Sequence, residues 1–508
     1  MTMEQASGGV RVTQERSRLA RGLVSGLLHE AFGAVLSFAA MILLVRLLTP
    51  QEYGQAAAAV AVLAFLGAFR GAMFVEHAMQ HTKDVEPAWD TYFVIGGLVQ
   101  GVLCLATLAL SAAFVWFDAL ASLAPLLQVA AIGFVLDWPA QIATVKLRRE
   151  LRFDYLKLLF ALSLLVRLSS SVLLAWLGLG AMALVISGNV LTAVPFAGSL
   201  FLIDKWRPRQ SWRTALATQD LADVLRFGAQ QIGASLLQSL RTAAEALILT
   251  KMFGAATFGL LNRASALYQT TIGRLGLVFM DTAYPLLPLE RGDRDRYAHR
   301  ATRFIEGAVV LSIPGAAIVA LEGAGLSRLF YGTKWSEADP FLAPAAIAVA
   351  ATALTSAAAY VLMGAARVTA AVAIESIVAV SGLLALVVVA ADASPAFYLW
   401  TLAALEVVFA SVSFTYVVPH LEADWHRRAL WPAVAASAAG CAGVVMFRWT
   451  VPGEGTFALL AALFIYGTLV AATLALTAPS LVLEVIQSRH AFVSRTRAAA
   501  AEVSRVSA

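Results

Sequence analysis

Charged residues and cysteine are both scarce in this sequence. Of its 508 residues, 14% are Asp, Glu, Lys or Arg, against about 25% in a typical soluble domain. The two cysteines, Cys104 and Cys441, lie far apart within apolar runs, so we expect neither a disulfide framework nor a metal site with cysteine spacing. A phosphate-binding G-x-x-x-x-G-K-[ST] motif is missing, which argues against nucleotide hydrolysis by this chain. We therefore expect no cofactor and no metal.

Apolar residues take the place of the missing charges. They make up 60% of the chain, whose mean hydropathy is +0.77. A helix needs about 20 apolar residues to cross the hydrocarbon core of a bilayer. Fourteen segments meet this requirement: 24–45, 55–75, 92–116, 120–144, 155–177, 180–203, 224–250, 263–289, 304–327, 341–364, 368–391, 396–418, 430–450 and 456–478. The sequence therefore predicts an all-α polytopic membrane protein. The segments between the spans are short and leave no room for a soluble catalytic domain, so we predict that the protein is not an enzyme.

The distribution of Lys and Arg predicts the orientation of the spans. If the N-terminus is inside, the inner segments hold 26 of these residues and the outer segments hold six, and such an excess is typical of cytoplasmic loops. The segment 76–91 disagrees, because it holds four acids against Lys83, but acidic residues weigh little in this rule. We predict that both termini are cytoplasmic. Their basic stretches, 11–21 and 489–505, fit either interfacial helices on anionic lipid or docking sites for assembly proteins.

The net charge of +5 would suggest nucleic-acid binding in a soluble protein. Here the basic residues lie between apolar runs, which is how topology is encoded in membrane proteins. We therefore expect no nucleic-acid partner.

Two segments of the chain resemble each other at an offset of 205 residues. They are ILLVRLLTPQEYG (42–54) and LILTKMFGAATFG (247–259), and both end an apolar run. An offset of six spans predicts two six-helix lobes followed by an extra pair, an arrangement found in secondary transporters. The alternative is that any outer helix end shows a basic residue and an aromatic-Gly turn. The predicted organisation is a basic cytoplasmic N-terminus at 1–22, an N-lobe at 23–203, a cytoplasmic linker at 204–223, a C-lobe at 224–419, a helix pair at 430–478 and a basic cytoplasmic tail at 479–508.

Polar side chains within the spans predict a functional interior, because a charge inside the bilayer normally faces protein or water. On the span 224–250 they fall on one side of the helix: Arg226, Gln230, Gln231, Gln238, Arg241 and Glu245. A similar stripe on the span 24–45 consists of Ser25, His29, Glu30, Gly33 and Ser37. Two facing stripes would line a wet cavity between the lobes.

Arginine suits an anionic cargo, because its planar fork matches phosphate oxygens and stays charged, while glutamine can hydrogen-bond sugar hydroxyls. The candidate cargo-binding residues are Arg70, Arg226, Gln230, Arg241 and Arg274. Arg226 could instead extend to the membrane interface, and Arg241 could pair with Glu245 four residues later. The sequence leaves these alternatives open.

Three acids within the spans are candidates for ion coupling: Glu30, Glu245 and Asp281. A buried carboxyl can carry a coupling proton, or it can be a counter-ion to arginine. The sequence does not decide between these roles.

Several of the same segments carry a family resemblance. RLLTPQEYG (46–54), LRRELRFDYLKL (147–158), FGLLNRASAL (258–267) and RLFYGTKWSEADPFL (328–342) resemble the polysaccharide transporter (Wzx-type oligosaccharide flippase) family. That family belongs to the multidrug/oligosaccharidyl-lipid/polysaccharide flippase superfamily, and the resemblance covers residues from about 20 to 420.

The resemblance implies a V-shaped pair of six-helix lobes whose central cavity opens alternately to each side of a bacterial inner membrane. It implies as cargo an oligosaccharide on an undecaprenyl pyrophosphate carrier, destined for exopolysaccharide, capsule or the O-antigen of lipopolysaccharide. A polysaccharide polymerase and export machinery are the partners it suggests. Two other functions stay open: export of drugs or other lipid-linked substrates, and a membrane glycosyltransferase or polymerase. The short outer segment 328–340 argues against the enzyme.

Overall fold

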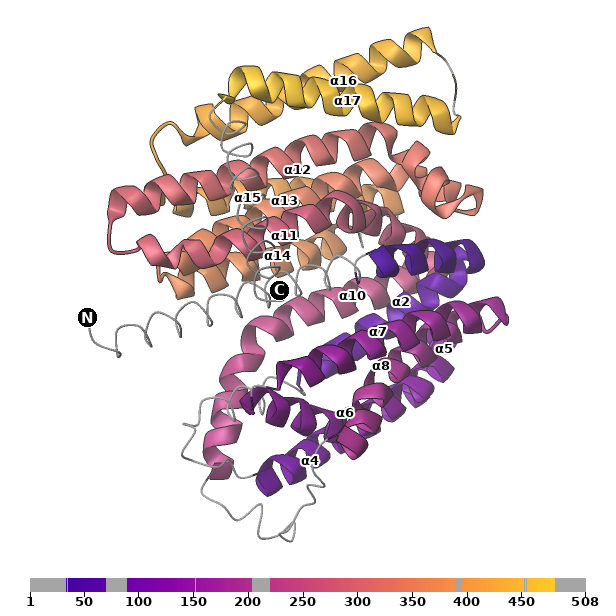
Figure 1. The fold of residues 1–508 in the computed structure, drawn as a ribbon. Coiled ribbons are helices and arrows are strands. Elements are labelled where there is room, and N and C mark those ends of the chain that lie inside the picture. The colour runs from indigo at the N-terminus through magenta and orange to yellow at the C-terminus, as the bar shows by residue number, and fades with distance from the viewer. Residues whose placement is uncertain are drawn as a thin grey trace, which may run out of the picture.

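The computed structural model describes residues 33, 35–69, 89–150, 152–202, 220–389, 394–451, 453 and 455–479 of the chain, with side chains at 153, 199–202 and 220–235 outside this description. Within these residues the structure is helical (Figure 1). After a helix at Val35–Leu47, the main helices are α2 (Pro50–Gly67), α4 (Trp89–Phe114), α5 (Asp118–Ala121), α6 (Ala124–Arg149), α7 (Phe153–Trp176), α8 (Ala181–Leu202), α10 (Asp220–Tyr268), α11 (Arg274–Ala283), α12 (Arg294–Tyr331), α13 (Asp339–Gly364), α14 (Val368–Val389), α15 (Pro395–Val417), α16 (Trp431–Thr450) and α17 (Thr456–Thr477).

Eleven helices of the described part are long and apolar enough to cross a membrane. The long segment Leu236–Glu290 counts as one of them, but α10 is broken at Gly254, whose φ of 85° and ψ of 161° are not helical. When this segment is divided at Gly254, and Val35–Leu47 and α2 are added, every predicted span has a helix. The helices of the first two spans are described only in part. The prediction of an all-α polytopic membrane protein is confirmed.

Three helix boundaries differ from the prediction for local reasons. The helix α2 begins at Pro50 rather than 55, because Thr49 Oγ1 accepts from Glu52 N (3.3 Å) and the Glu52 carboxylate accepts from Thr49 N (2.8 Å), a reciprocal cap. The second arm of α10 begins directly after Gly254 rather than at 263. The helix α12 starts at Arg294 rather than 304, because the Asp293 carboxylate caps its first turn.

The helices form two bundles that meet along α10 (Figure 1). In the first, α6 packs on α4 and α8, and α7 packs on α8; in the second, α13 packs on α12, α14 and α15. The pair α16–α17 lies along α12 on the outside of the second bundle. The long helix α10 packs on α13 and α14 of the second bundle. It also contacts α2 of the first bundle.

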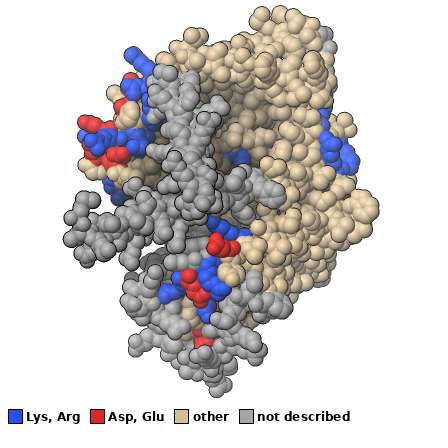
Figure 2. All heavy atoms as spheres, viewed as in Figure 1, with Lys and Arg blue, Asp and Glu red and all other residues tan. Residues whose placement is uncertain are grey.

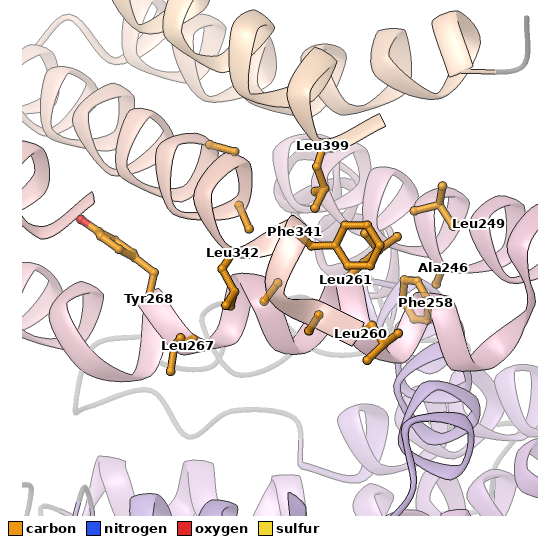
Figure 3. Close-up of a cluster of buried hydrophobic side chains, with 14 of the residues drawn as sticks. Ala246, Leu249, Phe258, Leu260, Leu261, Leu267, Tyr268, Phe341, Leu342 and Leu399 are labelled. Carbon is orange, nitrogen blue, oxygen red and sulfur yellow. The ribbon is translucent and has the colours of Figure 1, made fainter. Parts of the chain in front are cut away.

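Apolar side chains of α10 form much of the core between these elements. Leu249 and Leu261 of α10 lie near Phe341 of α13 and Leu399 of α15, and all four are buried (Figure 3). Within a bilayer such contacts stabilise the fold by close van der Waals packing, because lipid tails are as apolar as leucine. Because α10 also packs against α2 of the first bundle, it is the element that joins the two bundles.

Large apolar side chains also cover the outside of the molecule. Trp116, Trp449 and Phe457 are 87%, 85% and 86% exposed, a placement that suits lipid rather than water. In Figure 2 the upper surface is mostly uncharged, while charged residues gather at the left, where α12 begins. Arg291, Arg294 and Arg296 are exposed at that end. The charge is thus concentrated at the helix ends, as expected for a multi-pass membrane protein.

Candidate functional site

The predicted site residues divide into those that the structure describes and those that it does not. Arg70 and Glu30 lie outside the described residues, and Arg226 and Gln230 lie on α10 where side chains are outside the description. The described candidates are Arg241, Glu245, Arg274 and Asp281.

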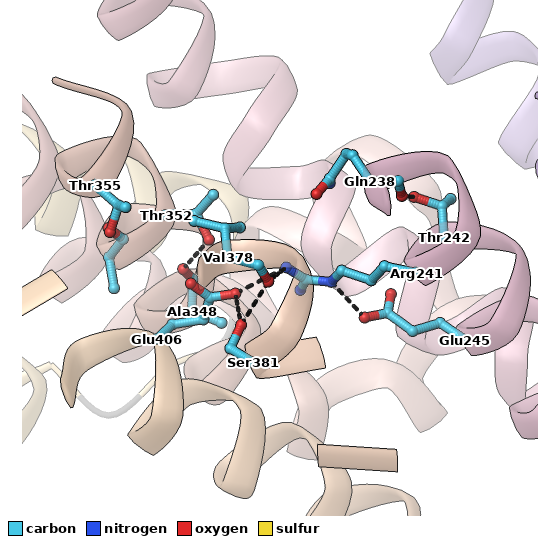
Figure 4. A network of polar contacts seen from close by, with 11 residues as sticks. Gln238, Arg241, Thr242, Glu245, Ala348, Thr352, Thr355, Val378, Ser381 and Glu406 are labelled. Atoms are coloured by element: carbon cyan, nitrogen blue, oxygen red, sulfur yellow. Dashed lines mark hydrogen bonds and ion pairs between the residues drawn. The ribbon is translucent and has the colours of Figure 1, made fainter. Parts of the chain in front are cut away.

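Arg241 is the centre of a buried charged cluster, shown in Figure 4, and is 8% exposed. Its Nε donates to Glu245 Oε1 (2.7 Å), and its Nη1 donates to Glu406 Oε1 (3.0 Å) and to the carbonyl oxygen of Val378. Ser381 Oγ lies 2.7 Å from both Glu406 Oε1 and Val378 O. These five residues, hereafter the Arg241 cluster, tie α10 to α14 and α15.

The pairing of Arg241 with Glu245 was one of the alternatives that the sequence left open, and the structure shows that pair. Two of the three guanidinium nitrogens of Arg241 are already engaged by carboxylates and a carbonyl. An anionic cargo would have to compete for them with Glu245 and Glu406. A cargo-binding role for Arg241 therefore stays a prediction, and a structural role in joining three helices is established by these contacts.

Glu406 is the member of the cluster that sequence analysis missed. It lies within the predicted span 396–418 and is fully buried. Its partner Arg241 is 165 residues away, so helix periodicity gave no signal for the pair. A search for every acid inside a predicted span would have found Glu406, although not its partner.

Arg274 and Asp281 lie on a different part of the chain. Both are exposed, and both belong to α11, which follows a π-helical turn at Gln269–Gly273. Because they are seven residues apart, their side chains emerge from the same face of this helix. The sequence predicted a cargo-binding arginine and a coupling acid here, and the structure brings the two onto one surface.

A second polar cluster, also missed by sequence analysis, lies inside the first bundle. Asp137 Oδ2 of α6 accepts from Gln100 Nε2 (3.1 Å) and Gln141 Nε2 (2.6 Å). Trp138 Nε1 donates to Phe93 O (2.7 Å), which fastens α6 to α4. These contacts satisfy the amide groups of Gln100 and Gln141 and the indole of Trp138 as donors in the membrane-spanning part of the bundle, where water is scarce.

The two bundles touch most closely where α2 crosses α10. A Cβ built on Gly54 would lie 1.8 Å from Ala255 O, and one on Gly259 would lie 2.2 Å from Pro50 O. No side chain fits at either position without moving a backbone, so glycine permits this approach.

Polar and aromatic contacts surround the glycine crossing. Arg46 Nη2 donates to Leu329 O (2.8 Å), Lys334 Nζ donates to Arg46 O (2.8 Å), and Trp335 Nε1 donates to Val45 O (2.9 Å). These bonds link the helix end before α2 with the last turn of α12 and the segment between α12 and α13. Side-chain donors on backbone carbonyls thus hold the two bundles together at this end.

The same end contains a cation–π contact. The Arg263 guanidinium carbon of α10 lies 4.1 Å from the centroid of the Tyr53 ring of α2, and that ring packs edge-on against Trp335 at 5.9 Å. Such a contact is worth about 0.5–2 kcal/mol, depending on desolvation. It adds to the bonds that close this end.

The described residues offer no group of three or more His, Cys, Asp and Glu side chains arranged to hold a metal ion. What the arrangement provides instead is a set of buried and exposed charges in a helical membrane protein whose two bundles meet at a tight crossing.

Comparisons with known proteins show which solved structures this fold resembles. A lipid II flippase MurJ in an inward closed conformation matches with a TM-score of 0.72 at 12% identity, covering 90% of this chain and 99% of that chain. A MATE protein in complex with MaL6 matches with a TM-score of 0.42 at 16% identity, covering 79% of this chain and 91% of that chain. No curated protein sequence matches. A family model described as polysaccharide biosynthesis protein matches residues 43–340, more than half of the sequence. The chain therefore belongs to this polysaccharide biosynthesis protein family, which agrees with the resemblance noted in its sequence.

Proposed function

We propose that this protein is a flippase that moves undecaprenyl pyrophosphate-linked oligosaccharide repeat units across a bacterial inner membrane, as a step in exopolysaccharide, capsule or O-antigen assembly. The observation that carries the proposal is the likeness of 90% of the chain to a lipid II flippase, in a member of a polysaccharide biosynthesis family. On this proposal the protein is a transporter and not an enzyme. A lipid-linked cargo fits an interior that carries charge within an apolar exterior.

The crossing of α2 and α10 supports transport by alternating access. The predicted topology, with both termini cytoplasmic, puts the glycine crossing and its surrounding bonds at the outer end of the bundles. Cargo would then bind from the cytoplasmic side while this end is closed. Separation of Gly54 from Gly259 would open the path outward, and the rigid helices on either side would move as bodies.

Among the residues that the structure describes, Arg274 is the strongest candidate for binding the phosphates of the cargo. It is exposed on α11 and can present a planar, permanently charged fork to phosphate oxygens. Arg70, Arg226 and Gln230 stay candidates for the same path, and Asp281 stays a candidate for coupling beside Arg274. Arg241 is buried and is held by the carboxylates of Glu245 and Glu406.

Glycan export in cells tests the proposal. A deletion strain should lose surface glycan and accumulate the lipid-linked repeat unit inside, and the wild-type gene should restore export. The variant Arg274→Ala should be present at normal levels and restore little export. Arg296→Ala is a matched control, because Arg296 is exposed and pairs with Asp293 at the start of α12. Normal glycan export in the deletion strain, with a defect in drug efflux instead, would overturn the proposal in favour of multidrug export.

A further inference from the structure

The charges of the Arg241 cluster do not balance. Two carboxyl groups, Glu245 and Glu406, contact one guanidinium, and Glu406 is fully buried. Two other buried acids of the second bundle also contact an arginine: Glu322 pairs with Arg448 and Glu306 pairs with Arg303. With both of its carboxyl groups ionised, the Arg241 cluster would hold a net negative charge inside the bundle.

Among the residues whose side chains the structure describes, the groups around the cluster supply no second positive charge. From α15, Tyr398 faces Arg241 and Glu245 with a neutral phenol. From α14 come the hydroxyl of Ser381 and a backbone carbonyl, and from α13 comes the hydroxyl of Thr352. Glu375, another acid of α14, lies near Tyr360 rather than near Arg241.

Burying an unbalanced charge costs several kcal/mol in a protein interior, and a carboxyl group avoids this cost by taking up a proton. The geometry indicates which oxygen would hold it. Glu406 Oε1 is already engaged by Arg241 and Ser381, whereas Glu406 Oε2 is buried and accepts a hydrogen bond from no described residue. A proton on Oε2 would turn this unused acceptor into a donor.

An acceptor for that donor lies close by. The Thr352 hydroxyl, beside Glu406 in Figure 4, uses its own hydrogen to donate to Ala348 O (3.0 Å). Its oxygen can therefore accept from a protonated carboxyl group.

We infer that the Arg241 cluster is a proton-binding site, with one proton held on Glu406 Oε2 in the conformation seen here. Binding joins a proton from water to the Glu406 carboxylate and leaves Glu245 and Arg241 as a balanced pair. Release leaves two carboxylates on one guanidinium. Solvating the buried Glu406 would relieve that charge, and it requires α15 to separate from α10 and α14.

The consequence for transport rests on the proposed function: proton uptake would favour the closed packing of these helices, and proton release would favour its opening. The proton itself can be measured without any transport, so failure of the site and failure of the flippase proposal are distinguishable.

Infrared spectroscopy of the purified full-length protein tests the site directly. A protonated carboxyl group has a carbonyl stretch that an ionised carboxylate lacks. The wild-type spectrum at neutral pH should contain this band and the Glu406→Gln spectrum should not. The sharper variant is Glu245→Gln, which leaves Glu406 intact. With Glu245 neutral, Glu406 alone balances Arg241, so it should ionise and the band should disappear. Glu322→Gln is the matched control and should keep the band, because Glu322 is a buried acid that pairs with Arg448 outside the Arg241 cluster.

The position of the proton has its own test. Thr352→Val removes the proposed acceptor without changing any charge, so the band should stay but shift in frequency. An unshifted band would overturn the assignment to Oε2. If Glu406→Gln does not fold, Glu245→Gln still tests whether the proton is present and Thr352→Val still tests its position. A wild-type spectrum without the band, or a band that survives in Glu245→Gln, would overturn the proton site.

Discussion

Gly54 of α2 and Gly259 of α10 make equivalent contacts, each with a backbone carbonyl of the other's helix. A Cβ on Gly54 would strike Ala255 O at 1.8 Å, and a Cβ on Gly259 would strike Pro50 O at 2.2 Å. Residues 50 and 255, like residues 54 and 259, are 205 positions apart, which is the offset of the sequence repeat. Repeat-related residues thus exchange partners across the crossing, as residues do at an isologous two-fold interface.

This contact predicts that alanine is not tolerated at the crossing. Gly54→Ala should destabilise the protein by about 1–3 kcal/mol, because its Cβ meets a backbone carbonyl rather than a flexible side chain. Gly467→Ala in α17 is the matched control, since nothing lies within 4 Å of a Cβ there. Thermal unfolding of the purified variants measures the difference. Equal stability of the two variants would contradict the close approach.

Locking the crossing should stop export. Phe38 and Phe330 lie on either side of the closed end, with ring centroids 5.3 Å apart. In a chain whose two natural cysteines are replaced, Phe38→Cys with Phe330→Cys should be joined by a short thiol cross-linker. Export should fall to the level of the deletion strain and recover when a cleavable linker is reduced. Full export in the cross-linked state would show that this end does not need to open.

How far the sequence predicts this structure depends on the range of the interactions. Apolar runs predict the spans, because burial in lipid is a local property of about 20 residues. The Thr49–Pro50 and Gly254 breaks mark helix ends through local backbone chemistry. The repeat places Gly54 and Gly259 at equivalent positions, but the sequence does not show that they touch.

The Arg241 cluster shows more clearly what the sequence alone cannot predict. Helix periodicity brings Arg241 and Glu245 together because they are four residues apart. It cannot bring Glu406 to them from another helix, and it does not say which bundle the polar side of α10 faces. Those relations come from packing between helices, which a single sequence does not record.

Arg241 and Arg274 should respond differently to removal. Arg241→Ala leaves two carboxyl groups without their shared guanidinium in a buried place, so folded protein should be largely lost; breaking a buried pair costs about 3–5 kcal/mol. Arg274→Ala should lower the yield of folded protein much less, because Arg274 is exposed. Size-exclusion profiles of the two purified variants test this. A stable Arg241→Ala protein would contradict the structural role of the cluster.

The pH dependence of stability should follow from the proton on Glu406. An exposed glutamate titrates near pH 4.3, so above that pH the unfolded chain lacks the proton that we place on folded Glu406. Stability should therefore fall as pH rises through the titration of Glu406 in the folded protein. The midpoint of thermal unfolding should fall in the wild type and change much less in Glu406→Gln. Identical slopes in the two proteins would contradict the prediction.

The pair Glu322–Arg448 should fasten α16 to α12. Arg448→Ala leaves Glu322 buried without this partner, and we expect a loss of about 3 kcal/mol or less, because the Arg448 side chain is 27% exposed. The double variant with Glu322→Ala should regain part of the loss. A double-mutant cycle by thermal unfolding measures the coupling energy. Additive effects would show that the pair does not join the two helices.

Transport by the purified protein tests the central claim most directly. Proteoliposomes would carry an undecaprenyl pyrophosphate-linked oligosaccharide, and a glycosidase added outside would report how fast the sugar from the inner leaflet becomes accessible. We predict rapid exposure with the wild type and with Arg296→Ala, and little exposure with Arg274→Ala. Sugar that stays protected in wild-type vesicles, at the rate of protein-free vesicles, would contradict the account.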